Sequence, residues 1–131
     1  MTCEHYLEQA KTNEQAARDL EKTYPDWAVT ICFYAALHWV EYYACKKGCD
    51  INQEYPGPSP HSSRKDYIRE LAFELGNRSL RNAYIELESE SRKARYLQDI
   101  NTSAKLYYTN NKLKVNQSFQ NLQKIRLLLG S

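Results

Sequence analysis

The stretch Trp27–Cys45 reads WAVTICFYAALHWVEYYAC, and only Thr30, His38 and Glu41 interrupt its apolar and aromatic side chains. A helix that is apolar on nearly all sides has to be surrounded by other helices or by lipid. His38 and Glu41 lie three residues apart in it and therefore require polar partners once they are buried. The stretch predicts a central helix with a polar cluster beside it.

The length of this apolar run favours a helix buried in protein over one that spans a membrane. The run extends only from Trp27 to Leu37, even with Thr30 allowed, and is shorter than the roughly 20 residues that a bilayer requires. The opening residues, MTCEHYLEQAKTNEQ, are polar and amphipathic and do not resemble a signal peptide. We therefore expect a soluble, cytoplasmic protein without a membrane partner.

Composition favours a single helical domain, 1–131. A chain of 131 residues is long enough to form one core without added cross-links. Its 18 basic and 16 acidic side chains leave a net charge of +2, which does not by itself indicate nucleic-acid binding. Only four glycines and four prolines interrupt the sequence, so long stretches are free to form helices. The prediction is an all-α, up-and-down bundle of four to five helices.

Turn residues and apolar periodicity give the bounds of these helices. Gly48 suits the end of the central helix, and the PGPSP run at 56–60 marks a loop after it. Ser62 or Ser63 is expected to cap the third helix. A break is expected near Asp99–Thr102, and a second one is possible within Thr109–Asn111. The expected helices cover about 4–22, 25–47, 62–75, 79–96 and 103–129.

The four cysteines are interpreted as structural thiols. No secretory signal supports disulfide formation, and the pair Cys45 and Cys49 is looser and more isolated than the paired ligands of zinc sites. His38, Glu41 and His61 are suitable residue types for a metal, but a structural or catalytic role without metal is favoured. We therefore expect no cofactor and no metal ion. The cysteines are Cys3, Cys32, Cys45 and Cys49.

Short connections between helices favour antiparallel neighbours. With strictly alternating directions, the end of the second helix, the start of the third and the end of the fourth meet at one end of the bundle. Glu41 would pair there with Arg64 or Arg95, because a buried carboxylate needs a cation. His38 lies within two to three turns of this end. The residues expected at this end are His5, Glu41, Cys45, His61, Arg64, Arg92, Arg95 and Tyr96.

Three segments together resemble the HEPN superfamily. They are YPDWAVTICFYAALHWVEYYACKKG at 24–48, the His-x-x-Arg start of the third helix at 61–64, and SRKARY at 91–96. The resemblance extends over about residues 6–96 and implies a small bundle of four to five helices, often a homodimer. Many members of the superfamily are metal-independent ribonucleases, and some are partners of nucleotidyltransferases. A homodimer and either partner, RNA or a nucleotidyltransferase, are therefore expected.

The chain departs from the nuclease motif of that superfamily, in which a histidine follows an arginine by about six positions on one helix. All three histidines precede Arg64, and Glu86 and Leu87 stand where a histidine would follow Arg81. The catalytic pair of the superfamily therefore cannot be carried over. Whether the chain is an enzyme stays open.

A substitute arrangement is one hypothesis for the polar cluster. His61 could act as a general acid or base, because imidazole titrates near neutral pH. Arg64 and Arg95 could hold a phosphate by forked hydrogen bonds as further catalytic residues. The expected binding residues are His38, Glu41, Arg92 and Tyr96, with Tyr96 stacking on a base.

We therefore predict that the function of this chain is related to RNA or to a nucleotide. The alternatives are a non-catalytic helical module that is a partner of a nucleotidyltransferase in a toxin–antitoxin-type pair, and a small-ligand pocket. The same side chains could also form an ion-pair network that only fixes helix register.

Overall fold

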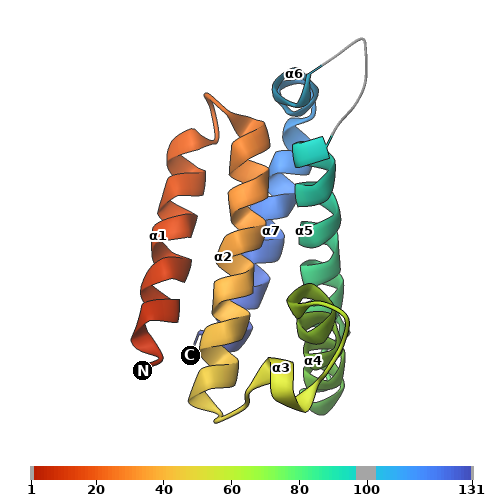
Figure 1. Cartoon of the computed structure of the whole chain (residues 1–131). Helices are drawn as coiled ribbons and strands as arrows, with labels where there is room; N and C mark the ends of the chain where they lie inside the picture. The colour runs from red at the N-terminus through yellow and green to blue at the C-terminus, as the bar shows by residue number, and fades with distance from the viewer. Residues whose placement is uncertain (1, 97–102, 131) are drawn as a thin grey trace.

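The computed structural model describes residues 2–96 and 103–130, and these ranges form seven α-helices without a β-strand (Figure 1). The prediction of an all-helical protein is confirmed. The helices are α1 (Glu4–Leu20), α2 (Pro25–Lys46), α3 (Ile51–Glu54), α4 (Pro60–Glu74), α5 (Arg78–Tyr96), α6 (Ala104–Thr109) and α7 (Lys112–Leu129).

Helix α2 lies at the centre of the bundle because its apolar residues point in nearly all directions. It packs against α1, α5, α6 and α7, and Figure 1 shows α1, α2, α5 and α7 side by side. Val29, Phe33 and Val40 are fully buried in this core. None of the described helices is long and apolar enough to cross a membrane.

Seven helices, rather than four or five, form in the described residues for local reasons. The expected loop after α2 contains α3, which Asp50 caps by accepting a hydrogen bond from the Gln53 amide at 3.3 Å. The possible break at 109–111 is present and separates α6 from α7. Ser59, and not Ser62 or Ser63, caps α4, with Pro60 at its first position. The break expected near Asp99–Thr102 lies outside the described residues.

Helix α4 runs in the same direction as α2, and α5 runs back beside it (Figure 1). The predicted alternation of directions is wrong at this point, because residues 49–59 return part of the way along the bundle before α4 begins. The His61 ring consequently lies 6.2 Å from the ring of Phe33, near the middle of α2. The start of α4 therefore meets the side of the bundle and not its end.

A disulfide joins Cys3 to Cys45 and connects the start of α1 to the end of α2. The antiparallel packing of these helices brings the two Cα atoms to 5.7 Å, within the usual range for a disulfide. The prediction of free thiols is wrong for this pair, because it considered the cellular compartment and not which helix ends meet. Cys32 and Cys49 are free, and burial raises the pKa of both thiols.

Candidate functional site

Arg64 connects α4 to α2 and is the centre of the candidate site. Ser59 and Pro60 start α4 so that His61 lies in the first turn and Arg64 one turn later on the same face. Arg64 is only 9% exposed. Its Nη1 donates to Glu41 Oε1 at 3.2 Å, and its Nη2 donates to His61 Nδ1 at 3.2 Å. The predicted pairing of Glu41 with Arg64 is present.

The hydrogen bond from Arg64 decides which nitrogen of His61 carries the proton. A guanidinium can only donate, so His61 Nδ1 has to accept. The neutral imidazole therefore carries its hydrogen on Nε2. The exposed ring stacks on Phe33 with an angle of 27° between the planes. His61 thus has an Nε2–H donor available to a ligand and an Nδ1 acceptor that is already occupied.

The surroundings of His61 lower its pKa below the usual 6.5. Partial burial of the ring is the main cause, and the charge of Arg64 is the next. Glu88 opposes the shift, while Arg95 and Arg92 add to it. His61 is therefore neutral at pH 7, in an environment that favours an added negative charge.

Nuclear magnetic resonance titration is expected to give a His61 pKa below 6.5, and Arg95→Gln is expected to raise it by removing a nearby positive charge. Because the unfolded chain binds this proton at higher pH than the folded chain, protonation of His61 opposes folding as the pH falls below about 6.5. Arg126→Gln removes a charge on α7 and is the control. A His61 pKa at or above 6.5 in the native protein would contradict this account.

Helix α5 contributes a second set of charges beside His61. Glu88 is buried and contacts Lys65 Nζ at 2.8 Å and Arg92 Nη2 at 3.2 Å. Arg95 Nη1 donates to the hydroxyl of Tyr34 at 2.9 Å. We call the side chains of His61, Arg64, Lys65, Arg92 and Arg95 the cationic face. Its four permanent cations face the two carboxylates of Glu41 and Glu88, so the face keeps a positive charge.

Tyr96 extends the cationic face toward the end of α5. Its ring is 64% exposed, and the guanidinium of Arg95 lies 5.3 Å from the ring centroid. The same guanidinium lies 5.8 Å from the centroid of Tyr34. Arg95 therefore lies within cation–π distance of two aromatic residues, one of which is largely exposed.

Two side chains of this region, Arg64 and Glu88, each contain a buried polar atom without a partner among the described residues. These atoms are Arg64 Nε and Glu88 Oε2, and elsewhere in the described ranges Asp26 Oδ1 and Trp39 Nε1 are likewise buried without a hydrogen-bond partner. Burial raises the pKa of Tyr84 to about 12, and the nearby charge of Arg64 opposes this shift. Buried polar groups are satisfied in most of a native protein, and exceptions concentrate at functional sites.

His38 and His5 lie away from the cationic face, although both were expected near it. His38 Nδ1 donates to the backbone carbonyl of Tyr34 at 2.7 Å, and Asn13 of α1 lies 3.4 Å from the same nitrogen. His5 Nδ1 donates to the Thr2 carbonyl at 2.8 Å. The expected site residues are therefore divided. His61, Glu41 and the arginines lie together, whereas His38 faces α1 and His5 contacts the backbone before α1.

Sequence reasoning missed Lys65 and Glu88. Glu88 precedes Arg92 by four residues, a spacing that places both on one helical face and could have indicated the pair. Lys65 follows Arg64 directly but points to α5, and this depends on the direction of α4. Within the described ranges, no group of three or more histidine, cysteine, aspartate or glutamate side chains could hold a metal ion.

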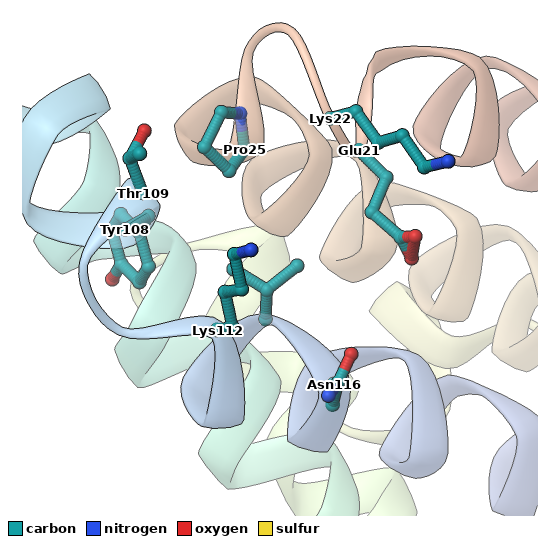
Figure 2. A pocket seen from close by; sticks show the side chains of 8 residues that line it. Glu21, Lys22, Pro25, Tyr108, Thr109, Lys112 and Asn116 are labelled. Carbon is teal, nitrogen blue, oxygen red and sulfur yellow. The ribbon is translucent and has the colours of Figure 1, made fainter.

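A separate cavity of about 420 Å³ lies between the α1–α2 turn and the α6–α7 turn (Figure 2). It contains none of the residues that the sequence predicted. Figure 2 shows Lys112 and Asn116 on α7, across from Glu21 and Lys22 at the end of α1. The complete lining is Glu21, Lys22, Pro25, Tyr108, Thr109, Lys112, Val115 and Asn116.

Comparisons of the chain with models of known protein families, with curated proteins and with solved structures find no significant match.

Proposed function

We propose that this chain is a HEPN-like domain that binds RNA or a nucleotide through the cationic face. The observation that carries the proposal is the exposed, neutral His61, whose Nε2–H has no acceptor among the described residues and lies near the positive charges of Arg92 and Arg95. Phosphate oxygens are the usual acceptors for such a combination of donors.

The geometry favours binding over general-base catalysis. A general base needs an unprotonated nitrogen directed at the substrate. The free nitrogen of His61 in the folded protein is the protonated one, because Arg64 occupies Nδ1. His61 would then stabilise negative charge as a donor, in a complex that need not be cleaved.

Arg92 of the cationic face is accessible to a ligand from solvent. The side chain of Arg92 is 61% exposed in its ion pair with Glu88. A phosphate can therefore reach this guanidinium from solvent, although its partner Glu88 is buried. Lys65 can keep Glu88 paired after such an exchange, since it contacts the same carboxylate oxygen.

The double variant Arg92→Ala/Arg95→Ala is expected to bind a labelled single-stranded RNA at least about tenfold more weakly in fluorescence anisotropy. The slope of log affinity against log salt should become shallower by about 1.4, because two phosphate contacts are lost at about 0.7 each. Binding by the native chain should weaken steeply with salt.

The matched control is Arg18→Ala/Arg126→Ala, which removes the same charge from the opposite side of the bundle, where both arginines contact Glu14. An equal loss in the control would mean that only net charge matters. Absence of salt-dependent RNA binding by the native chain would reject the proposal and favour the non-catalytic module that is a partner of a nucleotidyltransferase.

A further inference from the structure

An exposed tryptophan lies on the same side of α2 as the cationic face. Trp27, Tyr34 and Glu41 are spaced by seven residues, about two helical turns, and so form one stripe. Glu41 contacts Arg64 and Tyr34 contacts Arg95. Trp27 is 54% exposed, in contrast to Trp39, which is 3% exposed in the core.

Trp27 and Arg95 line one cavity, which connects the tryptophan to the cationic face. The cavity measures about 260 Å³. Six described residues line it, namely Asp26, Trp27 and Thr30 of α2, Ala94 and Arg95 of α5, and Ala104 of α6. His61 stacks on Phe33, which follows Trp27 by six residues on α2. At 1.5 Å per residue, the two positions are about 9 Å apart along the helix axis. A short oligonucleotide can therefore contact both places.

The cavity combines an aromatic residue with two opposite charges, and this combination suits a flat, neutral group. It is lined by Trp27, Thr30 and two alanines, and its charged members are the carboxylate of Asp26 and the guanidinium of Arg95. Asp26 Oδ1 is buried without a hydrogen-bond partner among the described residues, and the opposite charges of Asp26 and Arg95 give the cavity no net charge. A nucleobase offers an aromatic surface for the indole and, on several bases, N–H groups for a carboxylate.

We propose that the ligand of this chain is single-stranded RNA, and that one unpaired base stacks on Trp27 while Arg92 and Arg95 hold the neighbouring phosphates. This inference rests on the proposed function. A base within a duplex is stacked on both sides and cannot reach an indole beside α2, so the site discriminates against double strands. Every base has an aromatic face, so stacking here gives little sequence preference.

The experiment combines anisotropy with tryptophan fluorescence. Three probes of equal phosphate number are compared: a single-stranded oligouridylate of about 12 nucleotides, an RNA duplex, and an oligomer of abasic ribose phosphates. The oligouridylate is expected to bind most tightly and to quench fluorescence in Trp39→Phe, where Trp27 is the only tryptophan. Trp27→Ala, in an otherwise native chain, is expected to bind it about tenfold more weakly, and Trp27→Phe only slightly more weakly.

The two proposals fail in different ways. If none of the probes binds, the proposed function is wrong. If all three probes bind equally, or if Trp27→Ala binds the oligouridylate as the native chain does, the cationic face binds phosphate and the inference about Trp27 is wrong. Binding without fluorescence quenching in Trp39→Phe also contradicts the inference, and the Trp27→Ala comparison does not depend on that variant.

Discussion

Replacement of Arg64 with alanine is expected to lower the free energy of unfolding by about 3 kcal/mol. Arg64 is nearly buried, and its removal leaves Glu41 without a cation and His61 Nδ1 without a donor. Loss of one partner from a buried ion pair destabilises proteins by about 3–5 kcal/mol, and the partial exposure of Glu41 places this case at the lower end. Urea unfolding of the variant and the native chain measures the difference.

A double-mutant cycle with Glu41→Gln is the control for this prediction. The cycle consists of Arg64→Met, Glu41→Gln and the double variant Arg64→Met/Glu41→Gln. The double variant should lose less free energy of unfolding than the two single variants lose together, with a coupling energy of about 1 kcal/mol or more. A coupling near zero would contradict the paired role of Arg64. The same variants test the role of Arg64 in binding: if Arg64→Met/Glu41→Gln is stable and still binds RNA as the native chain does, the pair acts only in folding.

Loss of the disulfide is the second large effect. Cys3→Ser/Cys45→Ser is expected to lower the free energy of unfolding by about 4 kcal/mol, the loop-closure value for a separation of 42 residues. For a chain of this size, that corresponds to a fall in Tm of about 10 °C or more. Thermal unfolding followed by circular dichroism, with and without a reducing agent, measures the effect.

Cys49→Ser is the matched control for the disulfide, because it removes a free thiol that follows Cys45 by four residues. It should leave the Tm nearly unchanged, and the reducing agent should lower the Tm of this variant as it lowers that of the native chain. An unchanged Tm of the native chain after complete reduction would show that the disulfide does not stabilise the folded state.

The core of the fold and one ion pair follow directly from sequence pattern. The run around Phe33 and Val40 is apolar on all sides, so its central position could be predicted. The need of Glu41 for a cation likewise predicted a pair with Arg64 or Arg95, and the structure has Arg64 as the partner. Both conclusions depend on local chemistry and not on how the helices are connected.

The remaining features depend on chain connections that pattern does not specify. Residues 49–59 contain α3 and reverse the expected direction of α4, so Lys65 reaches Glu88 and the cluster forms on the side of the bundle. The disulfide depends in the same way on which helix ends meet. The exposure of Trp27 was also unpredictable, because it begins a run whose other members are mostly buried.

The position of α4 has a consequence for motion. Helix α2 is packed against α1, α5, α6 and α7, whereas α4 is packed mainly against α3 and α5 and contacts α2 through the Arg64–Glu41 ion pair and the His61–Phe33 stacking. Proteins open locally where packing is least extensive, at a free energy below that of global unfolding. Opening of α4 would carry His61, Arg64 and Lys65 away from α2 and α5 while the central helices stay folded. The ligand affinity would then depend on the fraction of molecules in which α4 is packed against the bundle. A ligand that bridges α4 and α5 would in turn protect the backbone amides of α4 from hydrogen exchange.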